Sequence, residues 1–230
     1  MLHNLLTNKT NISLACCFIQ MYTYFLSGSA EFLLFAVMSV DRYLAICYPL
    51  RYTGIMHRRL CFQLMAGVWI GSFFTNLMPL ILLSRLTFCR NLINHFFCDV
   101  APLLQNSCTD TTVIQIILTA SSSTLFISFI ITFASYSNII LAILKIQSVK
   151  GRGRAFSTCS SHAIVVTLIY GSCIFMYAKP MQGKRAEFNK QVALVNTVVV
   201  PLINPFIYTL RNQNVRKILK ECFNAYFKNW

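Results

Sequence analysis

An acid–base pair, Asp41 and Arg42, is the part of this sequence with the clearest potential for chemistry. It directly follows an apolar run that begins near Cys17 and contains one other charge, Glu31. Since burying a charge in hydrocarbon costs several kcal/mol, the pair is expected at the point where a helix leaves a lipid bilayer. Taken alone, it predicts an ion pair that anchors the end of this helix.

The histidines give no indication of catalysis. His3, His57, His95 and His162 form no recognisable triad, and the apolar stretches contain no H-E-x-x-H motif and no phosphate-binding glycine loop. The segment from His95 to Asp99 could bind a soft metal if Cys98 were reduced, but Cys98 is expected to be oxidised. We therefore predict no enzyme activity, no cofactor and no metal site.

The composition is that of a membrane protein. The chain has 230 residues, of which 56% are hydrophobic and 11% are charged, whereas soluble domains carry about 25% charged residues. A bilayer-spanning helix needs about 20 consecutive apolar residues. We predict an all-α, multi-span transmembrane helix bundle of one domain, with a cytoplasmic tail helix at about 213–227 and five spans at about 17–42, 61–83, 113–146, 155–178 and 191–210.

The distribution of positive charge predicts the orientation in the membrane. The formal net charge of +14 comes largely from arginines and lysines on alternate loops, including Arg58, Arg59 and a charged turn at 150–154 that we expect to be flexible. The side richer in these residues is cytoplasmic in membrane proteins. The N-terminus is therefore expected outside and the C-terminus inside, with anionic membrane lipids, and no nucleic acid, as neighbours of the basic loops.

Four cysteines fall at or beyond the outer boundary of the predicted spans, where the surroundings are oxidising. They are Cys17, Cys89, Cys98 and Cys108. Four cysteines allow three pairings, and their spacing does not choose among them.

Motifs along nearly the whole chain resemble those of olfactory receptors, a branch of the rhodopsin-like G-protein-coupled receptors. The resemblance lies in residues 12–20, 38–52, 94–99 with Cys108, 135–136, 154–162 and 201–212, and in Trp69. It implies helices three to seven of a seven-helix receptor. The first two helices are then missing, as expected for a fragment, a mis-predicted gene or a degenerate receptor.

The resemblance implies an odorant receptor of the plasma membrane. Such a receptor binds small volatile hydrophobic ligands and activates a stimulatory heterotrimeric G protein of the olfactory type. The alternative is a truncated product that does not signal. A transporter or channel is disfavoured, because the chain has no inverted repeat and no charged conduction path.

The resemblance also assigns roles to individual residues. It implies disulfides between Cys17 and Cys98 and between Cys89 and Cys108. The implied G-protein switch comprises Asp41, Arg42, Tyr43, Tyr136, Asn204, Pro205 and Tyr208. The implied ligand-binding residues are Tyr24, Phe25, Gly28, Ser29, Ala120, Ser121, Thr124, Tyr170, Cys173, Ile174, Tyr177, Leu194 and Thr197.

Overall fold

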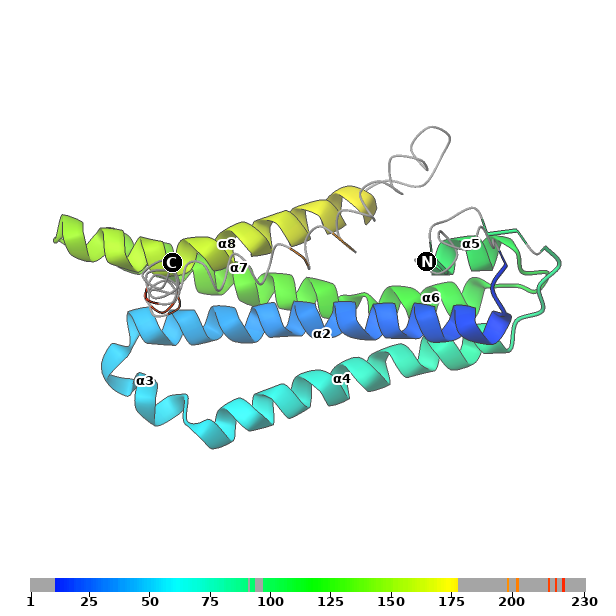
Figure 1. The fold of residues 1–230 in the computed structure, drawn as a ribbon, viewed down its shortest axis with the longest axis horizontal. Helices are drawn as coiled ribbons and strands as arrows, with labels where there is room; N and C mark the ends of the chain where they lie inside the picture. The colour runs from blue at the N-terminus through cyan, green and yellow to red at the C-terminus, as the bar shows by residue number, and fades with distance from the viewer. Residues whose placement is uncertain are drawn as a thin grey trace, which may run out of the picture. The chain divides into compact units, whose positions relative to one another are not determined.

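The structure is a computed structural model, and it describes residues 11–90, 92–93 and 97–177 together with the single positions 198, 202, 215, 218 and 221. The chain divides into two compact units, residues 1–139 and 140–230, which are described separately. Helices dominate the described residues: α2 (Leu14–Cys47), α3 (Pro49–Ile55), α4 (Arg58–Ser84), α5 (Val100–Gln105), α6 (Thr112–Ser121), α7 (Ser123–Leu144) and α8 (Val149–Tyr177). This is the predicted all-α fold class (Figure 1).

Helix α2 has clear sequence signals at both ends. Ser13 caps its start, because the Ser13 side chain accepts a hydrogen bond of 3.3 Å from the backbone N–H of Cys16. The helix stops before Tyr48, because Pro49 disfavours helical geometry at the preceding residue. Its 34 residues span about 50 Å, which exceeds the roughly 30 Å hydrocarbon core of a bilayer. This length is greater than a single bilayer crossing requires.

Two described helical stretches are long and apolar enough to cross a bilayer. They are α4 and the 33 residues from Thr112 to Leu144, which α6 and α7 form together. Ser122 lies between α6 and α7, and its N–H donates to the carbonyl of Leu118 across 3.0 Å. The first predicted span falls within α2, and residues 155–177 of the fourth fall within α8. The fifth span and the tail helix lie outside the described residues, apart from the single positions given above.

Residues 150–154 are expected from the sequence to form a flexible charged turn, and the structure corrects this expectation because they are helical. Residues 149–177 form one continuous helix, α8, which includes Gly151 and Gly153. Each glycine costs a helix about 1 kcal/mol relative to alanine. The long apolar segment that follows in the same helix offsets this penalty. The glycines alone, without that segment, suggest a turn.

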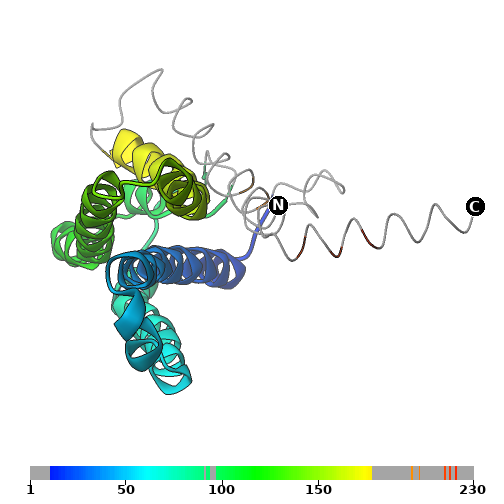
Figure 2. The ribbon, with the colours of Figure 1, turned by 90° about the vertical axis from the view of Figure 1, so that its left-hand side faces the viewer.

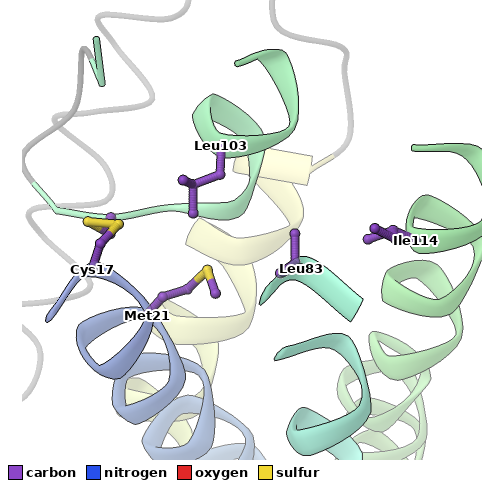
Figure 3. Packing of buried hydrophobic residues seen from close by; sticks show 6 residues of the cluster. Cys17, Met21, Leu83, Leu103 and Ile114 are labelled. Atoms are coloured by element: carbon purple, nitrogen blue, oxygen red, sulfur yellow. A yellow bond between two sulfur atoms is a disulfide. The ribbon is translucent and has the colours of Figure 1, made fainter. Parts of the chain in front are cut away.

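Helices α2, α4 and α6 of the first unit are joined at one end by a buried apolar cluster. Helix α4 packs against both α2 and α6, and Figures 1 and 2 show α4 alongside α2. The cluster comprises Cys17, Met21, Leu83, Cys98, Leu103 and Ile114 (Figure 3). Leu83 is fully buried, with 0% of its surface exposed. Because these residues come from α2, α4, α5, α6 and the segment just before α5, the cluster fixes how the helices meet at this end.

Candidate functional site

Hydrogen bonds made by polar side chains join α2 to α4 and α4 to α6, at positions nearer the middle of α2 and α4 than the apolar cluster. The Asn76 Nδ2 group donates to the Ser29 hydroxyl of α2 across 2.7 Å and to the backbone carbonyl of Ser72 across 2.8 Å. The Ser121 hydroxyl of α6 donates to the carbonyl of Thr75 across 3.3 Å. We call Ser29, Ser72, Thr75, Asn76 and Ser121 the polar cluster. It connects three helices in a segment that is otherwise mostly apolar.

Several residues with an implied ligand role lie on these helices in the first unit. Tyr24, Phe25 and Gly28 share α2 with Ser29, Ala120 precedes Ser121 on α6, and Thr124 lies at the start of α7. The Tyr24 ring contacts the rings of Phe25 and Phe97, with centroids 5.3 and 4.7 Å apart. Aromatic surfaces beside a few fixed polar groups are typical of sites for small apolar ligands.

The remaining implied ligand residues lie elsewhere. Tyr170 and Cys173 are buried in α8, within the second unit. Ile174 and Tyr177 belong to the same helix, and Leu194 and Thr197 fall outside the described residues. The ligand role of all these residues stays a prediction.

Sequence reasoning did not single out Thr75 and Asn76, which connect Ser121 and Ser29 to α4. A signal for one of them was present, because Asn76 is an amide within the apolar stretch 61–83. Polar side chains inside a membrane span commonly bond to a neighbouring helix. The identity of the partner helix, however, depends on the packing of the helices.

Two disulfides hold the segment between α4 and α6 at the end of the apolar cluster. They join Cys17 to Cys98 and Cys89 to Cys108, with Cα–Cα distances of 5.4 and 5.6 Å. These are the pairs that the resemblance implies. A short antiparallel bridge between Phe88 and Ser107 adds backbone pairing beside the second disulfide. The Cys17–Cys98 bond thus ties the start of α2 directly to this segment.

Asn106 organises the same segment from within. Its side chain donates to the carbonyl of Leu92 across 2.8 Å, and its own carbonyl accepts from the N–H of Cys89 across 2.9 Å. Asn106 is buried, so these bonds satisfy polar groups that would otherwise be costly to remove from water. The described residues of this segment that pack beside the cluster containing Leu83 include Phe88, Ile93 and Val100.

The far end of α2 carries the acid–base pair. The Arg42 Nε lies 3.6 Å from Asp41 Oδ2, and the Tyr52 hydroxyl of α3 donates to Asp41 Oδ1 across 2.9 Å. Asp41 thus has both of its oxygens engaged. The Arg42 side chain is 44% exposed and the Asp41 side chain 20%. We call Asp41, Arg42 and Tyr52 the arginine end.

Tyr43 and Tyr136, two further residues of the implied switch, lie on described helices. The Tyr43 hydroxyl donates to that of Tyr48 across 3.5 Å, and the two rings meet edge to face with centroids 5.7 Å apart. Tyr136 lies on α7. Asn204, Pro205 and Tyr208 fall outside the described residues. Their switch role, like that of the others, stays a prediction.

Within the described ranges, no three histidine, cysteine, aspartate or glutamate side chains come together in a way that could hold a metal ion. His95 is outside those ranges.

Removing the Tyr52 hydroxyl is expected to loosen α3 from α2. The hydrogen bond to Asp41, with some desolvation, raises the pKa of Tyr52 above its ordinary value. The neutral phenol is therefore favoured in the folded chain, and this stabilisation is present below pH 10 and lost as pH rises through the raised pKa. Tyr52→Phe should cost about 0.5–1.5 kcal/mol locally, measured as faster amide hydrogen exchange in α3.

Ultraviolet titration of the Tyr52 phenol in an Asp41→Asn variant provides the companion measurement. Asparagine removes the carboxylate charge, so the pKa of Tyr52 should fall toward its ordinary value. Tyr43→Phe is the control, because Tyr43 bonds to Tyr48 and not to Asp41. An unchanged pKa of Tyr52 in Asp41→Asn would contradict the assigned hydrogen bond.

Comparison with known proteins places this chain among receptors. The olfactory receptor family model matches residues 1–225. Olfactory receptor 6S1 of Homo sapiens is 46% identical over 226 residues, covering 97% of this chain and 68% of that protein. Olfactory receptor 6E1 of Mus musculus is 46% identical over 231 residues, covering 99% of this chain and 74% of that protein.

The fold is also similar to that of a solved receptor. The crystal structure of squid rhodopsin matches with a TM-score of 0.57 at 13% identity, covering 98% of this chain and 65% of that one. At this identity the similarity concerns the fold alone. Together with the family match over nearly the whole sequence, it leads to one conclusion: this chain belongs to the olfactory receptor family, whose members are multi-pass membrane receptors and not enzymes.

Proposed function

We propose that this chain binds small volatile hydrophobic odorants in the outer half of its helix bundle and activates a stimulatory heterotrimeric G protein in response. We base this on one observation. A single helix, α2, carries Ser29 of the polar cluster and, nearer its other end, the Asp41–Arg42 pair. Ligand contact and partner contact are thereby joined by one element.

The spacing along α2 suits mechanical coupling. Thirteen residues separate Ser29 from Arg42, which corresponds to about 20 Å along an α-helix. A helix is a rigid element, so a shift or tilt imposed at Ser29 is carried to the arginine end. A ligand that binds one orientation of α2 more tightly than another would shift the population toward that orientation.

The arginine end suits contact with a protein partner. Arg42 is half exposed, and its pairing with Asp41 is long, at 3.6 Å. Exposed ion pairs of this kind are worth about 0–1 kcal/mol, so a partner can replace the pairing at little cost. Asp41 would remain satisfied after such a replacement, because Tyr52 donates to its other oxygen.

The disulfides support an orientation in the plasma membrane. Disulfides form and persist on the oxidising, outer side of a membrane. The Cys17 end of α2 is then outside, and the opposite end with Arg42 faces the cytoplasm, where a G protein is found. The basic loops on that side would lie beside anionic lipid, in agreement with the distribution of charge.

Odorant-evoked cyclic AMP in cells expressing this chain tests the proposal. We expect at least one small volatile compound to raise cyclic AMP in a dose-dependent manner, while cells carrying an empty vector give no response. Surface labelling on the same cells verifies delivery to the plasma membrane. If the chain reached the cell surface but no compound in a broad odorant panel raised cyclic AMP, the result would contradict signalling. It would favour the truncated, non-signalling alternative.

A further inference from the structure

The hydrogen-bond donors of the polar cluster are almost all in use. Both hydrogens of the Asn76 amino group are engaged, one by the Ser29 hydroxyl and one by the Ser72 carbonyl. The bond to a backbone carbonyl, which can only accept, fixes the orientation of this amide. The Ser29 hydroxyl in turn donates to the carbonyls of Phe25 and Leu26, across 2.8 and 3.1 Å.

The α6 side of the cluster follows the same pattern. The Thr75 hydroxyl donates to the carbonyl of Gly71 across 2.8 Å, and the Ser121 hydroxyl donates to the carbonyl of Thr75. What these side chains can still offer to another molecule is acceptor capacity. It resides in the Asn76 carbonyl oxygen and in the lone pairs of the hydroxyl oxygens.

Ser72 is the exception in this cluster. Its side chain is 0% exposed, and its Oγ has no hydrogen-bond partner among the described residues. A buried hydroxyl without a partner is energetically unfavourable, and such a group is stabilised by any molecule that supplies one. Ser72 lies one helical turn before Asn76, so the two residues share a face of α4.

The cluster itself carries no formal charge. The nearest acid along α2, Glu31, is two positions from Ser29, and residues at this spacing on a helix do not face each other. A carboxylate or ammonium group on a ligand would therefore enter an apolar, neutral site without a counter-charge, which is costly. The site favours a neutral ligand group.

We propose that the polar cluster selects ligands that carry an alcohol hydroxyl, an inference that rests on the odorant-binding function proposed above. The ligand hydroxyl donates to the carbonyl oxygen of Asn76 or to Ser29, and its oxygen accepts from Ser72. Ser29 and Asn76 are half-buried, which leaves part of each side chain open to a ligand. Ser72 is fully buried one helical turn from Asn76, so the ligand oxygen meets its hydroxyl only by entering beside Asn76.

Aldehydes, ketones and ethers match these donors and acceptors less well, because their oxygens can accept hydrogen bonds but cannot donate them. They can take the hydrogen of Ser72, but they leave the acceptors of Asn76 and Ser29 without a new donor. One fewer hydrogen bond corresponds to about a fivefold to tenfold weaker affinity. The cluster thus discriminates by the presence of a ligand O–H group.

Ligand-induced thermal stabilisation of the purified full chain in detergent micelles provides the test. The probes are n-octanol, its isomer heptyl methyl ether, and n-octanal, which are similar in size and in apolar surface. We expect half-maximal stabilisation by the alcohol at a concentration about fivefold to tenfold lower than for the other two. Equal effects of all three probes would overturn the alcohol preference and leave odorant binding intact. If neither these three probes nor any other volatile compound stabilised the chain, the result would instead count against the proposed function.

Two variants locate the preference in the cluster. Ser72→Ala removes a donor that the oxygens of all three probes can use, so it should weaken stabilisation by each of them about fivefold to tenfold and leave their ratio unchanged. Asn76→Leu combined with Ser29→Ala removes the acceptors of the ligand O–H group and should reduce the difference between the alcohol and its ether isomer to about twofold or less. The unliganded melting temperature of each variant shows whether it is folded, and Ser72→Ala should melt no lower than the parent chain.

Ser137→Ala is the matched control, since the Ser137 hydroxyl donates to the carbonyl of Phe133 within its own helix. It should keep the full difference between the alcohol and the ether. A folded Asn76→Leu, Ser29→Ala variant that keeps that difference would overturn the assignment of the hydroxyl site to this cluster, as would a Ser72→Ala variant that binds all three probes like the parent chain.

Discussion

Replacing Cys17 by serine is expected to lower the amount of folded chain at the cell surface by at least about tenfold. The bond to Cys98 closes a loop across a sequence separation of 81 residues. Disulfides typically contribute about 2–4 kcal/mol, largely by restricting the unfolded chain, and more for longer loops. Because Cys17 and Cys98 also belong to the buried cluster around Leu83, their loss removes packing as well as the cross-link.

Surface labelling and the melting temperature of the purified protein measure this effect. Cys16→Ser is the matched control, because Cys16 is the adjacent cysteine on α2 and is exposed with a free thiol. It should behave like the parent chain. Cys98→Ser should match Cys17→Ser, and the double variant should be no worse than either single one, since both remove the same bond. If Cys16→Ser were as damaging as Cys17→Ser, the cross-link would not be the cause.

Replacing Arg42 by alanine is expected to weaken signalling about a hundredfold and to leave ligand binding in place. Truncating one member of a charge pair at a protein interface costs about 2–5 kcal/mol, so the odorant concentration needed for cyclic AMP should rise by about a hundredfold. Ligand-induced thermal stabilisation should remain, because Arg42 lies about 20 Å along α2 from Ser29. The separation of the two readouts distinguishes a coupling residue from one required for folding.

Arg85→Ala controls for the loss of a positive charge. Arg85 is an exposed arginine at the C-terminal end of α4, which is the end near Leu83 and far from Arg58. It should respond to odorants like the parent chain. Arg42→Lys keeps the charge but not the fork of donors and should retain part of the response. Normal signalling by Arg42→Ala would refute the role proposed for the arginine end.

The helices could be predicted from the sequence because their signals are local. The apolar run up to Asp41 indicates the span, and Pro49 sets the end of helical structure at Tyr48. Helix α2 nevertheless extends five residues beyond the predicted boundary at Arg42. Charged and polar residues can continue a helix once it has left the hydrocarbon, so the edge of the membrane and the end of the helix need not coincide.

The contacts between helices could not be predicted in the same way. The bond between Ser29 and Asn76 joins residues 47 positions apart, and the sequence carries no signal for the rotation of α4 that brings them together. Tyr52 meets Asp41 because the chain turns at Tyr48, and the geometry of that turn depends on backbone angles outside the helical range. Family resemblance supplied the disulfide pairs, which spacing alone had left open.

The Cys17–Cys98 bond has a consequence for biosynthesis. In the topology proposed above, α2 and α4 are two crossings of the bilayer between Cys17 and Cys98, which puts both cysteines on the same side. A nascent chain in which α4 failed to insert would then leave Cys98 in the reducing compartment, away from Cys17. Formation of this disulfide therefore requires that both helices have inserted.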